Sequence, residues 1–195
     1  GRKAVVEFDG VYMNSDVWLN GHALGHWPYG YTSFNYDLAP FLNFDGQPNV
    51  LAVRVDNSKQ PNSRWYSGSG IYRHVWLTVT DPLHVAQWGT YVTTPKVSAE
   101  SATVRIRTRV QNEHTNNRAV TLMSQVMDAD GQILKRILTM TETNKSIPAH
   151  GEYEFDQTIE LPKPRLWSPD TPYLYKVHSL VESGGQPMDE YETPI

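Results

Sequence analysis

One short stretch combines a guanidinium, an indole and a phenol with two glycines: RWYSGSG, residues 64–70. Asn62 precedes it, and Asp56 lies near the end of the strand-like run before it. Loops on a rigid scaffold are where binding residues concentrate, so this stretch is the first candidate for function. In a second interpretation, Trp65 and Tyr66 only cover the end of a hydrophobic core. For Asp56, the corresponding alternative is a carboxylate that fixes the loop backbone, as Asx residues do.

Strand-like runs flank this stretch on both sides. In residues 49–57, Leu51, Val53 and Val55 fall on one face, and the odd positions from Ile71 to Val79 repeat the same pattern apart from Arg73. Alternation with a period of two residues is typical of strands, and glycine, proline and asparagine are typical of turns. The sequence therefore predicts that residues 58–70 form a loop between two strands.

The same alternation recurs over most of the chain, for example in residues 4–8, 102–110 and 153–161. Asn20-Gly21 is a strong hairpin signal, because both residues tolerate the positive φ angles of a tight turn. Pro82 has no N–H to give to a strand ladder and marks a boundary. We therefore expect two β domains, residues 1–82 and residues 83–195.

A row of arginines follows one face of residues 102–110, namely Arg105, Arg107 and Arg109. Such a row could be a basic stripe for nucleic acid. Residues 152–160 carry acidic side chains at the same period, and opposite charges on neighbouring strands pair favourably. The preferred hypothesis is that these two strands are adjacent, with Arg107 and Asp156 in the same sheet.

Composition excludes several classes of function. The net charge is −4 and 19% of residues are charged, so we expect neither nucleic acid nor a membrane surface as a partner. No apolar run reaches the ~18 residues of a membrane span. There is no cysteine, which removes disulfides, cysteine zinc sites and thiol nucleophiles. His22 and His26 have the spacing of a metal pair on a helix, but they flank a hairpin without a third ligand, and we expect no metal or cofactor.

Several stretches resemble the N-terminal sugar-binding domain of glycoside hydrolase family 2, and they are most similar to its β-galactosidases. They are FDGVY and VWLNG in residues 8–21, GYTSF in residues 30–34, and VRVDN, RWYSGSGIYR and VWL in residues 53–77. LWSPDTPYLY in residues 166–175 is typical of the immunoglobulin-like domain that follows in this family. The resemblance covers nearly the whole chain.

The resemblance implies an all-β chain. Its first part would be a partial jelly-roll (galactose-binding-like) sandwich, and its second part an immunoglobulin-like β-sandwich. The opening strands of the jelly roll would be absent, which would leave a strand edge uncovered and prone to self-association. The barrel that holds the family's two catalytic glutamates has no counterpart here, so no residue of this chain is expected to be catalytic.

The resemblance also implies where substrate would be bound. In the family, an acidic side chain from the 58–70 loop reaches the galactosyl unit, and Arg64 stands at that position here. Sugars are recognised by aromatic faces and by planar polar groups, which makes Asn62, Arg64, Trp65 and Asp56 the expected substrate-binding residues. Trp27 and Tyr29 are weaker candidates.

We therefore expect a non-catalytic part of a retaining β-galactosidase, which supports the catalytic barrel and lends loops to its β-galactoside pocket. The expected partners are carbohydrate, that barrel and a second copy of the protein in a homo-oligomer. The expected location is the bacterial periplasm or the cell exterior, with the cytoplasm as the alternative. Two other functions stay open: the same region of a β-glucuronidase or β-mannosidase, and a free-standing carbohydrate-binding module.

Overall fold

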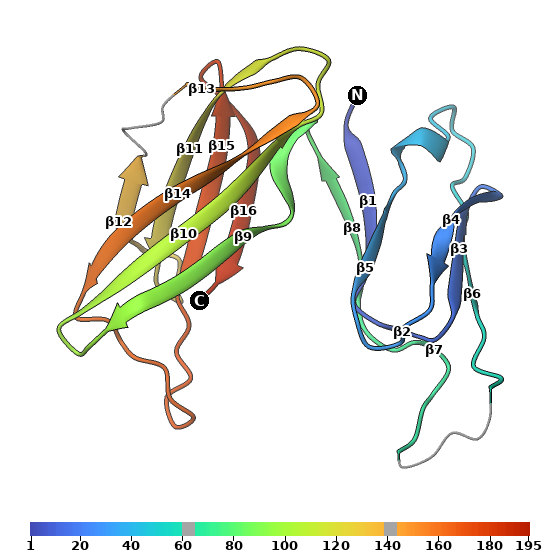
Figure 1. The fold of residues 1–195 in the computed structure, drawn as a ribbon, viewed down its shortest axis with the longest axis horizontal. Coiled ribbons are helices and arrows are strands. Elements are labelled where there is room, and N and C mark those ends of the chain that lie inside the picture. Colours follow the sequence, from blue (N-terminus) through green and yellow to red (C-terminus); the bar gives the residue numbers. More distant parts are fainter. Residues whose placement is uncertain (60–64, 139–143) are drawn as a thin grey trace. The chain divides into compact units, whose positions relative to one another are not determined.

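The computed structural model describes residues 1–59, 65–138 and 144–195, without the side chains of residues 135–138. In this part of the chain every regular element is a strand, apart from one short 3-10 helix, η1 (Ala39–Phe41), so the all-β prediction is confirmed (Figure 1). The chain divides into two compact units, Gly1–Thr80 (unit 1) and Asp81–Ile195 (unit 2). The division falls two residues before the predicted boundary.

Unit 1 is built from two antiparallel sheets and a short ribbon. One sheet has the strand order β5-β1-β8, the other has the order β4-β3-β6, and β2 pairs with β7 in the ribbon. The bounds of these strands are β1 (Lys3–Phe8), β2 (Val11–Tyr12), β3 (Ser15–Leu19), β4 (His22–Trp27), β5 (Phe34–Asp37), β6 (Leu51–Val55), β7 (Gly70–Ile71) and β8 (Val75–Thr80).

The core of unit 1 lies between its two sheets. Strands β1 and β3 bury every second residue, as their sequence alternation predicts. Phe8 is fully buried, and its ring stacks on Phe34 with 5.0 Å between the ring centroids. The predicted hairpin is confirmed, because β3 and β4 pair around Asn20 (φ 50°) and Gly21 (φ 83°).

The strand predicted over residues 71–80 is wrong in two respects. It is broken, because Ile71 pairs with β2 whereas β8 pairs with β1. Its expected buried face is also exposed: Leu77 is 66% exposed and Val79 is 48% exposed. Val6 of β1, which pairs with Leu77, is buried, so this face of the sheet is covered over β1 but left uncovered over the edge strand β8 in the described structure. A cavity of about 450 Å³, open to solvent, lies beside it and is lined by Leu77 and Val79 together with Leu19 from β3.

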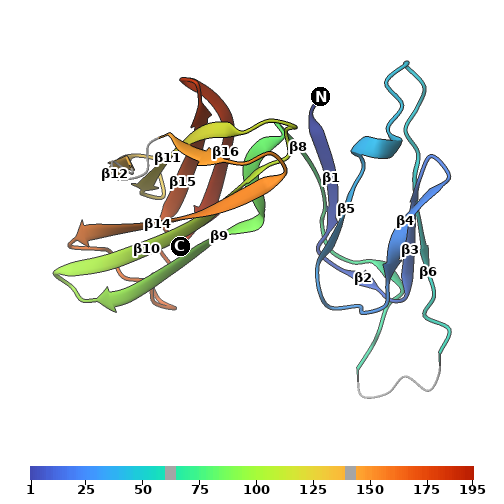
Figure 2. The same cartoon turned by 45° about the horizontal axis from the view of Figure 1, so that its top comes forward.

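Unit 2 is a sandwich of two larger antiparallel sheets (Figure 2). One has the order β14-β10-β9, and the other has the order β12-β11-β15-β16, with β13 paired to β11. The bounds are β9 (Leu83–Val97), β10 (Ser101–Asn112), β11 (Arg118–Met127), β12 (Ile133–Leu138), β13 (Lys145–Ile147), β14 (Gly151–Pro162), β15 (Lys176–Ser183) and β16 (Gln186–Pro194).

The alternating runs of unit 2 form its core, as predicted. Strand β10 buries every second residue from Ala102 to Asn112, and these lie beside buried residues of the neighbouring strand β14, such as Phe155. On the outer face, Arg107 lies opposite Asp156 in the β10–β14 register, so the predicted adjacency is confirmed. Arg105 pairs with Asp156, and Arg107 pairs with Glu154 at 3.6 Å. The arginine row is thus an ion-pair ladder on a sheet surface.

Candidate functional site

The loop with the predicted binding residues leaves β6 and returns at β7. Asn62 and Arg64 lie outside the described residues. On either side of them the loop is held together by Asn57, whose Nδ2 donates to the carbonyl of Ser67 at 3.3 Å and to Oγ of Ser69 at 3.1 Å. This bridge joins the two ends of the loop, and it fixes the backbone that follows Trp65 in the sequence.

Trp65 points away from the core. Its side chain is 63% exposed and that of Tyr66 is 94% exposed, so the interpretation that both cover a hydrophobic core is wrong. The indole Nε1 of Trp65 donates a hydrogen bond of 2.9 Å to Oη of Tyr31. This bond fixes the indole edge while leaving much of the ring surface open to solvent.

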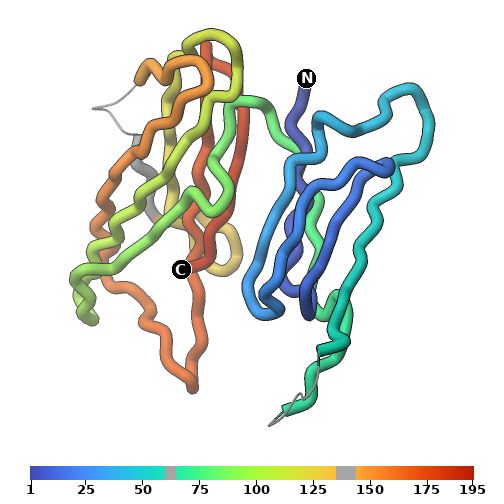
Figure 3. The backbone as a smooth tube through the Cα atoms, turned by 45° about the vertical axis from the view of Figure 1, so that its right-hand side comes forward, coloured from blue at the N-terminus to red at the C-terminus, as the bar shows by residue number. Residues whose placement is uncertain are grey.

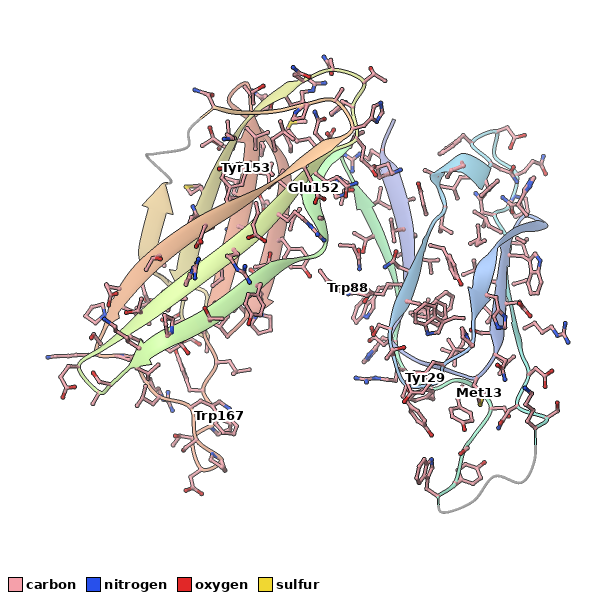
Figure 4. All side chains as sticks on the ribbon, in the orientation of Figure 1. Met13, Tyr29, Trp88, Glu152, Tyr153 and Trp167 are labelled. Atoms are coloured by element: carbon pink, nitrogen blue, oxygen red, sulfur yellow. The ribbon has the colours of Figure 1, made fainter. Side chains whose placement is uncertain are left out.

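Trp65 belongs to a group of rings that we call the aromatic cluster: Tyr12, Tyr29, Tyr31 and Trp65. Tyr31 is its centre, with ring centroids 5.2 Å from Tyr12 and 5.8 Å from Tyr29. Tyr29 and Tyr31 are 55% and 45% exposed. Figure 4 shows Tyr29 at the end of unit 1 where β2 and β7 lie. The cluster unites residues from the start of the chain, the segment after β4 and the predicted loop.

Gly30 makes this arrangement possible. A Cβ atom at position 30 would lie 2.2 Å from Cδ2 of the Tyr12 ring, which no real contact allows. The backbone carbonyl of Gly30 also accepts a hydrogen bond of 2.7 Å from Oη of Tyr72. The absence of a side chain at Gly30 therefore lets the backbone approach the Tyr12 ring closely.

Asp56 uses its carboxylate within its own loop. Its Oδ1 accepts hydrogen bonds from the hydroxyl of Ser58 at 2.6 Å and from the backbone N–H of Ser58 at 3.0 Å. The Ser58 hydroxyl contributes most to holding the pKa of Asp56 below its ordinary value. The backbone N–H of Asp56 donates to the carbonyl of Met13 at 3.1 Å. This geometry matches the alternative role of an Asx residue that orders a turn.

The remaining candidates make packing, ring-stacking or ion-pair contacts within unit 1. Trp27 packs against the core of unit 1 and stacks on Phe34 at 5.4 Å between centroids. His26 pairs with Asp16 at 2.8 Å, and the ring of His22 stacks on the ring of Phe41. Among the residues that the structure describes, no group of three or more His, Cys, Asp or Glu is placed to hold a metal ion.

Sequence reasoning missed Tyr12 and Tyr31 as site residues. The one available signal was the pair of tyrosines on either side of Gly30, since an aromatic residue beside a glycine in a polar segment has little core to enter. Tyr12 gave no such signal, because its position depends on the β2–β7 pairing.

The aromatic cluster presents exposed ring faces with phenol hydroxyls at their edges. Aromatic rings of this kind have an apolar body and a polar edge, and they contribute large contact area with few rotatable bonds. The matching ligand is a flat molecule with an apolar face and hydroxyl groups around its rim. A sugar ring has this chemistry.

Comparisons with known proteins agree with this chemistry. The model of the family described as Glycosyl hydrolases family 2 matches residues 83–195. A β-galactosidase of Bacteroides ovatus, BoGH2A, is 50% identical over 190 residues, which cover 97% of this chain and 22% of that protein. A β-glucuronidase of Formosa agariphila is 33% identical over 215 residues, covering 100% of this chain and 21% of that protein.

A solved structure of a β-glucuronidase from glycoside hydrolase family 2 superposes with a TM-score of 0.92 at 33% identity, covering 100% of this chain and 22% of that one. The chain thus spans 21–22% of the length of these proteins. The described part of the chain contains no helix with the length and hydropathy that a membrane span needs.

Proposed function

Because this chain belongs to glycosyl hydrolases family 2, we propose that it is the non-catalytic part of a retaining β-galactosidase that hydrolyses terminal β-galactosides. The polypeptide then continues into a catalytic unit, and the longer protein encoded by the whole gene is called the full-length enzyme below. Unit 1 lends its aromatic cluster to the substrate pocket of that enzyme, and unit 2 supports the catalytic unit.

The aromatic cluster is the observation that carries this role. Trp65, Tyr29 and Tyr31 are exposed, yet they are held in place by ring contacts and by the Trp65–Tyr31 hydrogen bond. Exposed rings that are already ordered bind with little further loss of side-chain entropy. The 50% identity to the B. ovatus β-galactosidase supports galactoside as the substrate.

The proposal assigns no catalysis to this chain, because a retaining glycosidase needs two carboxyl groups about 5–5.5 Å apart. The carboxylate of Asp56 accepts its hydrogen bonds from Ser58. Asp9, which precedes β2, accepts a hydrogen bond from the indole of Trp76 at 3.1 Å and lies 3.4 Å from His74. These contacts give both carboxylates structural roles.

A second candidate is a β-glucuronidase. It is favoured by the F. agariphila relative at 33% identity and by the β-glucuronidase structure with a TM-score of 0.92. The substrate of such an enzyme carries a carboxylate, which arginine recognises better than lysine because it can donate two parallel hydrogen bonds. The two candidates differ in the sugar and share the fold and the role of this chain.

The deciding experiment measures hydrolysis of aryl β-galactoside, aryl β-glucuronide and aryl β-mannoside by the full-length enzyme. The expected result is a kcat/KM for the galactoside at least about tenfold above the others, a difference of ~1.4 kcal/mol in transition-state binding. A higher kcat/KM for the glucuronide would establish the second candidate instead. The 195-residue chain, assayed at high concentration, is expected to match the no-protein blank. Turnover that copurifies with this chain would show that the catalytic carboxyl groups lie within it.

A further inference from the structure

A long connection in unit 2 carries large apolar side chains on its surface. Residues 163–175 join β14 to β15 without forming a strand, and Figure 3 traces them as a loop that projects from unit 2. Leu166, Trp167 and Leu174 are 45%, 58% and 49% exposed. Connections longer than about 12 residues are uncommon in compact domains and usually have a function. We call these three side chains the Trp167 face.

The backbone of this loop is fixed by its own hydrogen bonds. Ser168 and Thr171 exchange backbone N–H···O bonds of 3.1 Å in both directions, and their hydroxyls lie 2.8 Å apart. The N–H of Tyr173 donates to the carbonyl of Thr171 at 2.8 Å. A closed turn of this kind holds Trp167 on the outside of the loop.

Both stems of the loop are also attached to the sandwich. The backbone N–H of Arg165 donates to Oη of Tyr175 at 2.6 Å, and the Arg165 guanidinium lies 4.3 Å from the centre of the Tyr173 ring. Oη of Tyr173 accepts from the N–H of Ala129 at 3.1 Å. The loop is therefore ordered while its largest side chains remain exposed, which is the arrangement of a preorganised binding surface.

Ile195 lies at the base of this loop. Tyr175 and Ile195 exchange backbone hydrogen bonds of 2.8 and 2.9 Å. A polypeptide that continues past Ile195 thus starts at the base of the loop that carries Trp167 (Figure 4 labels Trp167). Two of the relatives are several times as long as this chain, which covers 22% and 21% of them. The part of the protein next in sequence is accordingly the occupant within closest reach.

A cavity beside the loop indicates the chemistry of that occupant. It has a volume of about 330 Å³ and is lined by the rings of Tyr173 and Tyr175 and by Lys163 and Arg165. The carboxylate of Asp128 on its wall accepts backbone hydrogen bonds from residues of its own turn. An apolar contact with acidic side chains at its rim would complement this surface, since interfaces combine an apolar centre with a polar rim.

We propose that the Trp167 face docks onto the catalytic unit that follows Ile195 in the same polypeptide. This inference rests on the proposed function, which supplies that unit. Trp167 is the central anchor, because tryptophans at the middle of an interface contribute a large share of the binding energy. The docking fixes the direction in which the polypeptide leaves unit 2.

The test compares Trp167→Ala with Trp88→Ala in the full-length enzyme. Trp88 lies on β9 and is 56% exposed, which matches the 58% exposure of Trp167. The measurement is the rate at which a non-specific protease separates the 195-residue part from the rest. Trp167→Ala is expected to raise this rate about tenfold or more, because cleavage follows the population of the undocked form. Trp88→Ala is expected to leave it unchanged.

The same substitution is made in the 195-residue chain, where Trp167→Ala is expected to leave the midpoint of thermal unfolding unchanged. A wild-type cleavage rate for Trp167→Ala in the full-length enzyme would overturn the proposal. A lower midpoint of thermal unfolding for Trp167→Ala in the 195-residue chain would overturn it too, because Trp167 would then stabilise unit 2 itself. Trp167-dependent dimers of the 195-residue chain in sedimentation would assign the face to a second copy instead.

Glycoside hydrolysis measured on the same samples separates this inference from the proposed function. If the enzyme is active and Trp167→Ala leaves the cleavage rate unchanged, only the docking proposal is overturned. If the polypeptide is inactive but its cleavage rate rises in Trp167→Ala, the docking proposal is supported and only the proposed glycosidase activity is overturned.

Discussion

At the scale of single residues, the site depends on a hydrogen bond between side chains that are far apart in sequence. Trp65 is held by Tyr31, and Tyr31 is in turn flanked by Tyr12 and Tyr29. The order of the cluster thus comes from contacts among exposed rings, outside the core. Such residues can be changed without unfolding the protein, which makes the proposed substrate contact testable.

Trp65→Ala is expected to lower kcat/KM of the full-length enzyme by roughly ten- to a hundredfold, the effect of losing one well-ordered aromatic contact of ~1.4–2.7 kcal/mol. In the 195-residue chain, stability is expected to change by no more than ~0.5 kcal/mol, since Trp65 is 63% exposed. Tyr31→Phe keeps the ring and removes the hydrogen-bond acceptor, so we expect a smaller loss. Full kcat/KM in Trp65→Ala would exclude Trp65 from the substrate pocket.

Asp189 provides a second residue-scale prediction, on pH. Burial raises the pKa of its carboxyl above the ordinary 3.8, although the N–H of Val85 donates to its Oδ2 at 2.8 Å. A raised pKa in the folded state favours the protonated form. The contribution of Asp189 to stability is therefore complete below pH 3.8 and is lost as the pH rises through the folded-state pKa.

Asp189→Asn keeps an acceptor for Val85 but cannot ionise. Urea unfolding of both proteins at several pH values checks the prediction, and the difference between them cancels the other titrating groups. The stability of the wild type relative to Asp189→Asn is expected to fall from acid to neutral pH. A difference that is constant with pH, or that grows in favour of the wild type, would show that burial does not control this carboxyl.

At the scale of elements, the two units differ in how their strands end. In unit 2 the charged outer face of β10 is matched by β14, through pairs such as Arg107–Glu154 at 3.6 Å. In unit 1 the edge strand β8 leaves Leu77 and Val79 exposed beside an open apolar cavity. Exposed apolar edge strands favour pairing with further chains.

Leu77→Lys tests this property of β8. The substitution is expected to reduce binding of a hydrophobic dye and self-association of the 195-residue chain, because a charge on an edge strand opposes pairing. Stability is expected to change by only ~0.5 kcal/mol, since Leu77 is 66% exposed. Val97→Lys on β9, where Val97 is 52% exposed, serves as the matched control. Self-association that persists in Leu77→Lys but disappears in Val97→Lys would show that the surface responsible for it lies on unit 2.

At the scale of the whole molecule, each unit has buried hydrophobic clusters of its own. The first residues of unit 2 are fixed within that unit. The Oδ1 atom of Asp81 accepts from the N–H of Leu83 at 2.9 Å and lies 3.1 Å from Nε2 of His114. Leu83 itself is fully buried. The core of unit 2 is thus formed by residues after Thr80.

Residues 81–195, produced alone, are therefore expected to fold and to unfold cooperatively with heat, as single domains of this size usually do. Near-UV circular dichroism and calorimetry measure this. Residues 1–80, produced alone, are expected to be less stable, because a smaller unit buries a smaller fraction of its surface and the cavity beside β8 remains open. A non-cooperative transition for residues 81–195 would contradict the prediction.

The sequence by itself determined the elements in which the local pattern of apolar and polar residues matches the pattern of burial. Strands β10 and β14 bury every second residue because each has one face on the core of a two-layer sandwich, where the pleat sends alternate side chains to the core. The Asn20-Gly21 hairpin also follows from local chemistry, since few other residues adopt two consecutive positive φ angles. The pairing of β10 with β14 was predictable from charge, because Arg107 and Asp156 attract across a ladder.

Only the tertiary structure decided which surfaces stay open and which distant residues meet. Strand β8 alternates like a buried strand, yet it is exposed, because burial depends on a neighbouring layer that the alternation does not encode. Trp65 and Tyr31 are 34 positions apart, and their contact depends on long-range pairing such as that of β2 with β7, which no local pattern encodes. Local periodicity records which face of an element is apolar, whereas the partner of that face is set by long-range packing.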